Sequence, residues 1–260
     1  MRGAALVTGG ARRLGRAMAL ALARRGHDVV VHYAGSGEEA AEVVAEIGAL
    51  GRRAVAVQSD LLEDARTATL IARAREAIGA PLAVLINNAS IFEYDRLGSI
   101  TADSWERHIA SNLRAPVMLT QDFAAQAPQA EPDARGEPVA QALVINMIDQ
   151  RVLKLTPEFA SYTVAKMGLW AFTRTAAQAL APHIRVNAIG PGPTLRGGRQ
   201  SESHFARQRA ATLLQRGANE DDIISALGYF LDAPAVTGQL LCVDGGQHLS
   251  WQTPDVLGTE

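Results

Sequence analysis

Short runs of apolar residues recur along the chain, and most of them are followed by a segment in which apolar residues return every three or four positions. Short runs bounded by turn residues are typical of buried strands, and the longer periodic segments are typical of amphipathic helices. Their alternation predicts an α/β fold, a doubly wound parallel sheet with helices on both faces. The predicted strands cover residues 4–8, 29–33, 54–58, 82–87, 142–147, 184–188 and 240–243.

The first predicted helix shows the helical periodicity most clearly. Leu14, Met18 and Leu22 lie on one face of it, and Gly26 is typical of the position just past a helix end. A second helix is expected over residues 38–50. Both helices follow a predicted strand, as the crossover connections of a parallel sheet require.

Two segments break this pattern. Residues 128–138 contain three prolines, a glycine and several charged residues, and we expect an exposed loop there. Residues 190–208 begin with Gly-Pro-Gly-Pro-Thr, and a segment of this composition after a strand either closes over a bound ligand or is a mobile surface loop. We expect residues 1–260 to form one domain, although this length would also allow two small ones.

The composition excludes several classes of protein. Charged residues make up 20% of the chain and the net charge is −2, so there is no basic excess for nucleic acid or anionic lipid. No apolar run approaches the roughly 18 residues of a membrane span, and no signal peptide is evident. Cys242 is the only cysteine, which excludes an intramolecular disulfide, and we expect it to pack in the core of a cytoplasmic protein. No metal site is predicted.

A glycine-rich turn follows the first predicted strand and leads directly into the first helix. Residues 8–15 read TGGARRLG, with glycine at Gly9, Gly10 and Gly15. Glycines at such a turn let the backbone approach a pyrophosphate, whose charge the helix N-terminus stabilises, although a tight strand-to-helix connection would also account for them. Arg13 stands where the usual pattern has a second glycine, and it adds a cation beside the phosphates or in the ligand cleft.

The end of the second predicted strand carries no acidic residue. An enzyme specific for NAD is expected to place a carboxylate there against the ribose 2′-hydroxyl, but residues 31–36 read VHYAGS. With Arg12 nearby and Ser36 able to donate a hydrogen bond, NADP(H) is the predicted cofactor. Asp60, after the third strand, is placed either to accept a hydrogen bond from the adenine amino group or to cap a helix.

A candidate proton donor is formed by Tyr162 and Lys166, which lie four residues apart. Residues at this spacing share one face of a helix, so the ammonium group can lie close to the phenol. A nearby cation favours phenolate and would lower the pKa of the phenol from about 10. A surface aromatic beside a solvated lysine would show the same spacing, so other motifs must support the interpretation.

The order of these motifs resembles the short-chain dehydrogenase/reductase family over essentially the whole chain. The resemblance implies a single-domain Rossmann-type sheet of about seven strands and an oxidoreductase activity. It implies that Tyr162 donates a proton, that Lys166 lowers its pKa and holds the nicotinamide ribose, and that Asn112 keeps a water that links the lysine to solvent. The Asn-Asn-Ala at residues 87–89 belongs to the same order, and Thr194 is expected to contact the nicotinamide carboxamide.

Asp149 departs from the family, which usually has serine at that position, and either the site is damaged or the chemistry differs. The pteridine reductases offer the second explanation, because four features of this chain are similar to theirs, and the enzyme they imply also resembles bacterial dihydromonapterin reductase. Those features lie at Arg13, at His32 and Tyr33 with Ser36, at Ser90 with Phe92, and at Asp149. Gly35 differs from their pattern, in which an arginine contacts the 2′-phosphate.

This resemblance implies a role for each residue near the substrate. Phe92 would stack on a flat ring and Ser90 would bond its edge, although Phe92 could also be a core aromatic. The predicted substrate-binding residues are Arg13, Ser90, Phe92, Asp149 and Tyr162. The predicted catalytic residues are Asn112, Asp149, Tyr162 and Lys166. The predicted cofactor-binding residues are Gly9, Arg12, Arg13, Leu14, Gly15, His32, Tyr33, Ser36, Asp60, Leu61, Asn88, Ala89, Ser90, Tyr162, Lys166, Pro191, Gly192 and Thr194.

The sequence therefore predicts a cytoplasmic NADPH-dependent reductase of a dihydropterin, in which Tyr162 and Asp149 supply or relay the proton. A reductase of another carbonyl or imine is one alternative. A catalytically silent NADP-binding sensor is another, but a sensor would not need the proton relay. The partner is expected to be a small molecule, without nucleic acid or membrane, and the family resemblance implies a homotetramer.

Overall fold

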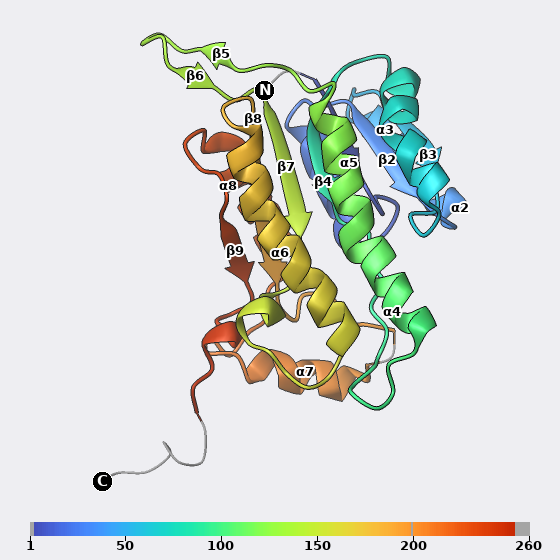
Figure 1. Ribbon diagram of the computed structural model, residues 1–260, viewed down its shortest axis with the longest axis vertical. Coiled ribbons are helices and arrows are strands. Elements are labelled where there is room, and N and C mark those ends of the chain that lie inside the picture. Colours follow the sequence, from blue (N-terminus) through green and yellow to red (C-terminus); the bar gives the residue numbers. More distant parts are fainter. Residues whose placement is uncertain (1–2, 199, 253–260) are drawn as a thin grey trace.

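The computed structural model describes residues 3–198 and 200–252, which are built around one seven-stranded sheet (Figure 1). The strand order is β3-β2-β1-β4-β7-β8-β9, and every neighbouring pair in this sheet is parallel, which confirms the predicted fold class. All the carboxyl ends of the strands therefore lie at one edge. The strands are β1 (Ala4–Val7), β2 (Val29–Tyr33), β3 (Ala54–Gln58), β4 (Leu82–Asn87), β7 (Ala142–Met147), β8 (Ile184–Pro191) and β9 (Leu240–Val243).

Helices pack against both faces of the sheet. Residues of α1, α2 and α8 share one apolar cluster with it, and residues of α3, α5 and α6 share the other, on the face that is toward the viewer in Figure 1. A π-helix, η1, joins α4 to α5 without a break. The helices are α1 (Arg13–Arg24), α2 (Gly37–Ala49), α3 (Asp64–Ile78), α4 (Ala102–Ile109), η1 (Ala110–Arg114), α5 (Ala115–Ala124), η2 (Gln150–Leu153), α6 (Ala160–Leu180), α7 (Glu202–Ala210), α8 (Glu220–Asp232) and η3 (Gln247–Leu249).

The predicted strands lie where the structure has them, with one larger difference at β8. This strand continues past the predicted end because Gly190 and Pro191 pair with Cys242 and Val243 of β9. The side chain of Cys242 packs against Gly190, where an added Cβ would lie 3.2 Å from its Sγ. Burial raises the pKa of the Cys242 thiol to about 12, in keeping with a packing residue.

The segment over residues 128–138 is largely exposed, as predicted, but it is not only a loop. Glu131–Pro132 (β5) and Pro138–Val139 (β6) form a short antiparallel hairpin, at the upper left of Figure 1. The turn between them is stabilised by Asp133, whose Oδ1 accepts a hydrogen bond from the backbone N–H of Arg135 at 2.7 Å. A turn made by one aspartate leaves no mark in the hydrophobic pattern, so the hairpin was not predicted.

The prediction of an irregular segment over residues 190–208 is wrong at both ends. Its first two residues belong to β8, and α7 begins at Glu202. Ser201 starts this helix, since its side chain accepts a hydrogen bond from the backbone N–H of His204 at 3.2 Å. Figure 1 shows α7 lying across the end of the sheet toward which the strands point. Over the stretches 3–198 and 200–252, no helix has both the length and the apolar character that a membrane crossing needs.

Candidate active site and cofactor pocket

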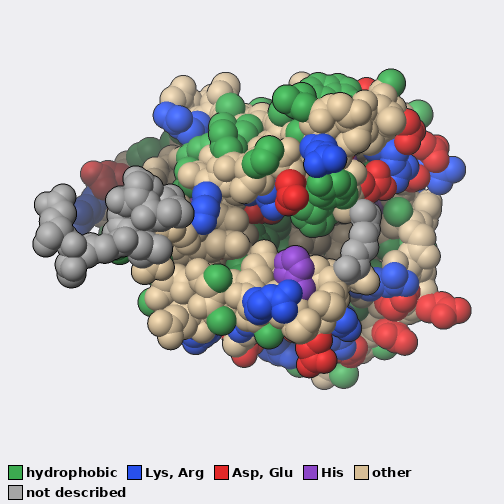
Figure 2. Space-filling view, turned by 90° about the horizontal axis from the view of Figure 1, so that it is seen from below, with side chains coloured by type: hydrophobic (Ala, Val, Ile, Leu, Met, Phe, Trp, Pro, Cys, Tyr) green, Lys and Arg blue, Asp and Glu red, His purple; other side chains and the backbone are tan. Residues whose placement is uncertain are grey.

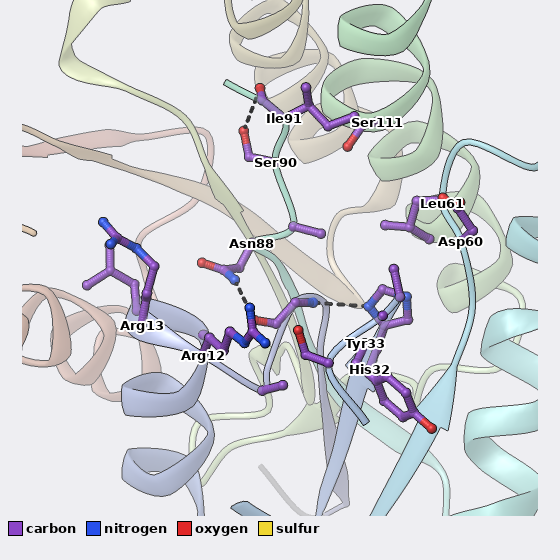
Figure 3. Close-up of a pocket in the computed structure, with 18 of the residues that line it drawn as sticks. Arg12, Arg13, His32, Tyr33, Asp60, Leu61, Asn88, Ser90, Ile91 and Ser111 are labelled. Atoms are coloured by element: carbon purple, nitrogen blue, oxygen red, sulfur yellow. Dashed lines mark hydrogen bonds between the residues drawn. The ribbon is translucent and has the colours of Figure 1, made fainter. Parts of the chain in front are cut away.

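A cavity of about 540 Å³ opens at the carboxyl ends of β1, β2 and β4, where the strand order changes direction (Figure 3). Ligands of doubly wound sheets bind at this kind of point. The lining includes every predicted cofactor residue from Gly9 to Ser90, and it also includes Ser111 of η1. Figure 2 looks onto this end of the molecule, where the surface is hollowed and basic side chains lie on both sides of the hollow.

The glycine turn is built for close backbone contact. Gly9 has φ +60°, and a Cβ added to Gly15 would lie 2.0 Å from the carbonyl oxygen of Gly9, so no side chain fits at that position. The N-terminus of α1 follows at Arg13 and lies in the wall of the cavity. A turn without side chains beside a helix N-terminus fits a pyrophosphate group.

Asn88 ties β4 to the glycine turn. Its Nδ2 donates hydrogen bonds to the carbonyl oxygens of Thr8 and Gly9, at 2.9 and 3.2 Å. The backbone N–H groups of Asn88 and Ala89 donate to Oγ1 of Thr8, at 2.8 and 3.0 Å. The amide of Asn88 therefore stabilises the floor of the cavity.

His32 lies beneath the glycine turn and uses both of its ring nitrogens there (Figure 3). The backbone N–H of Gly9 donates to Nδ1 at 3.0 Å, so the proton is on Nε2, which donates to the carbonyl oxygen of Ser59 at 2.9 Å. Burial lowers the pKa of His32 to about 4. Although His32 was predicted to bind the cofactor, these contacts make it a support for the turn, a role that its sequence position did not reveal.

We expect this histidine to make the fold sensitive to acid. In the unfolded chain its pKa is about 6.5, so between pH 6.5 and 4 the unfolded state takes up a proton that the native state does not. Stability is thus lost as the pH falls through this window. Relative to a His32→Gln variant, the free energy of unfolding of the native protein should fall by about 3 kcal/mol between pH 7 and pH 4. Urea unfolding of both proteins at several pH values measures it, and a difference independent of pH would contradict the assignment.

The rim expected to hold the 2′-phosphate contains an acid that the sequence analysis overlooked. The guanidinium of Arg12 forms an ion pair with Glu39, in the first turn of α2, and Ser36 precedes that helix without capping it. The backbone N–H of Glu39 itself, and then Arg12, lower the pKa of this exposed carboxylate. The end of β2 itself carries no acid, but helix α2 brings Glu39 to Arg12 at the same rim.

Asp60 does not cap a helix. Its Oδ1 accepts a hydrogen bond from the backbone N–H of Leu62 at 3.0 Å, and the residue that precedes α3 is Glu63. The alternative of a helix cap is therefore wrong. Contact with an adenine amino group stays a prediction for Asp60, which lines the cavity beside Leu61.

The candidate catalytic residues meet where β7 gives way to η2. The hydroxyl of Tyr162 on α6 donates a hydrogen bond to Oδ2 of Asp149 at 3.1 Å. Oδ1 of Asp149 accepts from the backbone N–H of Arg151 at 2.8 Å, at the start of η2. Lys166, one turn further along α6, is buried, and its Nζ donates to the carbonyl oxygen of Met147 at 2.8 Å. Residues from β7, from the start of η2 and from α6 thus form one polar cluster.

The pKa of Tyr162 is raised, not lowered as the spacing to Lys166 suggested. Burial raises it most, and the charge of Asp149 and the hydrogen bond to it raise it further. Burial likewise raises the pKa of Asp149, and burial lowers the pKa of Lys166 to about 8. Lys166 Nζ lies 5.7 Å from the centre of the Tyr162 ring, whereas Oδ2 of Asp149 lies 3.1 Å from the Tyr162 hydroxyl. At neutral pH the tyrosine therefore keeps its proton.

Phe92 lies at the entrance to this cluster and is half-exposed, so the alternative of a core aromatic is wrong. Its ring stacks on Phe159 with the centroids 4.3 Å apart and meets Tyr162 edge-on at 4.7 Å. Asn112 holds the preceding residue, since its Oδ1 accepts from the backbone N–H of Ile91 at 2.9 Å and its Nδ2 donates to the Ile91 carbonyl oxygen at 2.8 Å. Sequence reasoning missed Phe159, because its stacking depends on a contact between distant segments.

Arg13 connects the glycine turn to the segment that precedes α7. Its backbone has φ +52°, and its guanidinium donates to the carbonyl oxygens of Leu195 and Arg196, at 3.2 and 2.9 Å. Thr194 is buried in the same segment, and its hydroxyl donates to the carbonyl oxygen of Gly192 at 3.1 Å. The structure thus brings this segment to the edge of the cavity, as the hypothesis of a ligand-covering loop requires.

Comparisons with known proteins give a consistent picture. The family model described as short chain dehydrogenase matches residues 3–206. A curated relative, 3-oxoacyl-(acyl-carrier-protein) reductase FabG of Staphylococcus aureus, is 31% identical over 96% of this chain and 99% of its own length. Among solved structures, FolM alternative dihydrofolate reductase 1 from Brucella suis, in complex with NADP, is 43% identical, with a TM-score of 0.89 over 97% of this chain and 98% of that chain.

A second solved structure, the same reductase from Brucella canis complexed with NADP, is 44% identical, with a TM-score of 0.89 over 97% of this chain and 96% of that chain. The prediction of NADP(H) as cofactor agrees with these neighbours. The relatives differ in what they act on: the curated relative is named for a 3-oxoacyl group, and the structural neighbours are named for dihydrofolate.

Proposed function

Because the chain belongs to the short chain dehydrogenase family, we propose that it is an NADPH-dependent reductase of a dihydropterin. The oxidoreductase activity and the use of NADP follow from the family and its structural neighbours. The observation that carries the choice of substrate is the hydrogen bond of 3.1 Å between the hydroxyl of Tyr162 and the carboxylate of Asp149. The identity of 43% to FolM alternative dihydrofolate reductase 1 supports the same choice.

Reduction of a dihydropterin ring adds hydride to a carbon and a proton to the adjacent nitrogen. When bound, the reduced nicotinamide supplies the hydride. Tyr162 supplies the proton, because its hydroxyl stays protonated and lies at the entrance beside Phe92. Transfer of that proton alone would leave a phenolate beside a carboxylate, two like charges in a buried place. In the proposed reactive state Asp149 carries a proton on Oδ2, so the hydrogen bond seen in the structure is reversed, and it passes this proton to the Tyr162 oxygen as the tyrosine proton leaves. Burial raises the pKa of Asp149 in the direction of this state.

The surroundings of this pair suit a flat aromatic substrate. The half-exposed ring of Phe92 offers a stacking surface next to the Tyr162 hydroxyl. Ser90 lies on the same segment and forms a hydrogen bond with Tyr162 that lowers the pKa of the phenol slightly against the larger effects of burial and Asp149. Arg13 lies across the cavity from Ser90 in Figure 3 and completes the proposed substrate-binding set.

Oxidation of NADPH by the purified protein across a panel of dihydropterins, dihydrofolate and small ketones tests the proposal. We expect turnover with at least one reduced pterin and little with ketones. The curated relatives favour a second candidate, a reductase of a ketone such as a 3-oxoacyl thioester. Efficient reduction of that substrate, with no reaction of any pterin, would replace the first proposal with the second.

We expect NADPH to be used with a kcat/KM roughly tenfold or more above that of NADH, the value of one charge-assisted hydrogen bond from Arg12 to the 2′-phosphate. The pairing of Arg12 with Glu39 competes with that bond. Arg12→Ala should therefore reduce the preference, and the matched variant Glu39→Gln should increase it. Steady-state kinetics with both cofactors on one substrate provides the measurement. Equal efficiencies, or a preference for NADH, would rule out this role of Arg12.

A homotetramer and a cytoplasmic location also belong to the proposal. The exposed apolar side chains of Met118 on α5 and of Val164 and Met167 on α6 support an assembly that covers these helices. Analytical ultracentrifugation tests the assembly, and a monomer at micromolar concentration would exclude it. The single, inert cysteine is in keeping with a reducing compartment.

A further inference from the structure

A buried chain of hydrogen bonds lies directly behind the aromatic residues of the site and takes no part in the proton transfer described above. We propose that Asp95, Ser161 and His108 form a positioning unit that fixes Phe92 and Phe159 against Tyr162 and thereby sets the affinity for substrate. The inference rests on the proposed function only in that the substrate is taken to stack on Phe92.

The unit joins three separate parts of the fold. Asp95 lies in the segment after β4, His108 on α4 and Ser161 on the first turn of α6, and each is at most 1% exposed. The Ser161 hydroxyl pairs with Oδ2 of Asp95, and the Ser161 backbone N–H donates to Oδ1 of Asp95 at 3.2 Å. Nδ1 of His108 lies 2.7 Å from Oγ of Ser161. Nε2 of His108 accepts from the backbone N–H of Glu93 at 3.1 Å.

The geometry assigns every proton in this series of hydrogen bonds to one atom. A backbone N–H can only donate, so Nε2 of His108 is unprotonated and the proton of the imidazole is on Nδ1. Nδ1 therefore donates to Oγ of Ser161, and the hydroxyl proton of Ser161 goes to the carboxylate of Asp95. The hydrogen bonds therefore run in one direction, from the Glu93 amide through His108 and Ser161 to Asp95. A buried network whose hydrogen bonds are all made holds its members rigidly.

The same three residue types form hydrolytic triads, but this arrangement has a different order. In a triad the histidine lies between serine and the acid and takes the serine proton. Here Ser161 lies between the other two and gives its proton to Asp95, and the serine oxygen is fully buried. The unit therefore cannot attack a substrate, and its role is to position the residues to which it is hydrogen-bonded.

Those residues are the aromatic ones. Phe92 lies between two residues with fixed backbones, since Asn112 holds Ile91 and His108 holds Glu93. Phe159, whose backbone N–H donates to the carbonyl oxygen of Asp95 at 2.7 Å, has φ +56°. An aromatic residue adopts this backbone region only when its surroundings hold it there.

The unit thus determines both ends of the ring stack. It holds Phe92 through Glu93 and Phe159 through Asp95, and Ser161 itself is the residue before Tyr162. Its loss would let the rings move relative to the Tyr162 hydroxyl without removing any atom that touches substrate.

Ser161→Ala is the central test, because it removes one oxygen atom and breaks the chain on both sides. Thr163→Val is the matched control, since its hydroxyl is also buried near the start of α6 but makes no hydrogen bond among the described residues. We expect Ser161→Ala to raise KM for the substrate about tenfold, with kcat changed by less than about threefold and NADPH binding unchanged. Thr163→Val should leave all three values as in the native protein.

Hydrogen exchange gives a second measurement that does not depend on the substrate. In Ser161→Ala the amides of Glu93 and Phe159 should exchange about tenfold faster, while the amides of β4 keep their native rates.

Two substitutions of His108 test the contact with Glu93 separately. His108→Gln retains an acceptor that can face the N–H of Glu93 and should show a smaller rise in KM than His108→Leu, which retains none.

The outcomes separate this inference from the proposed function. If the native protein reduces no pterin, the exchange experiment still applies and KM is measured for the substrate that it does reduce. Exchange and KM in Ser161→Ala that match the Thr163→Val control would overturn the positioning unit. Exchange that rises equally at β4 would also overturn it, because the unit would then support only general stability.

Discussion

Replacement of Tyr162 by phenylalanine is expected to lower kcat by on the order of 10³-fold and to leave the binding of NADPH intact. The hydroxyl is the only proposed acid in contact with the substrate position, so its loss removes a step for which the ring offers no substitute. The ring itself should remain in place, because its contacts with Phe92 at 4.7 Å and with His108 at 6.1 Å do not involve the hydroxyl. Single-turnover kinetics, combined with NADPH fluorescence, measures both quantities.

Lys166→Ala provides a contrast to this variant. Lys166 is fully enclosed and its ammonium is close enough to Asp149 to influence that carboxylate, so its loss should weaken both turnover and cofactor binding. If Tyr162→Phe retained most of its kcat, the tyrosine would have no place in the mechanism.

Substitution of Asp149 by serine should lower kcat for a dihydropterin by about 10²–10⁴-fold, the range for a positioned proton donor. Serine can still accept a hydrogen bond from Tyr162 or donate one to it, but its hydroxyl is far too weak an acid to transfer a proton to the oxygen that the first proton leaves. Asp149→Asn is a sharper control, because it preserves the shape of the side chain and replaces the acidic carboxyl group by an amide that cannot act as an acid near neutral pH. Both variants should bind NADPH as the native protein does.

The pH dependence of the native protein completes this prediction. The pKa of Asp149 is raised, so kcat should fall as the pH increases through that pKa and the carboxyl group loses its proton. This limb should be absent from the pH profile of Asp149→Ser. If Asp149→Ser instead improved the reduction of a ketone and the native protein ignored every pterin, the chain would be an ordinary carbonyl reductase with an altered site.

Much of the fold could be predicted because strands buried on both faces must be apolar throughout. The glycine turn was predictable for a related reason, since Gly15 has no room for a side chain. The roles of polar side chains were harder to predict, because they depend on which distant segments meet. His32 supports the turn through its hydrogen bonds with Gly9 and Ser59. The ion pair between Arg12 and Glu39 forms only because α2 lies beside the glycine turn.

The pKa of Tyr162 shows the same limit in energetic terms. The spacing correctly places Tyr162 and Lys166 on one helix face, but it says nothing about burial or about the carboxylate of Asp149, which comes from the segment between β7 and η2. Those two effects decide the direction of the shift. Phe159 was missed for a comparable reason, since its importance comes from a ring stack with a residue far away in the sequence.

The two oxygens of the Asp149 carboxyl group are not equivalent, and this gives the proton transfer a fixed path. Oδ1 accepts a hydrogen bond from the backbone N–H of Arg151, a donor that never changes its protonation state, so a proton on that oxygen would face another proton. Oδ2 is therefore the oxygen that can carry a proton, and Tyr162 lies against it. Rotation of the carboxyl group to exchange the two oxygens would break both hydrogen bonds. Asp149 thus passes its proton to Tyr162 through Oδ2 alone.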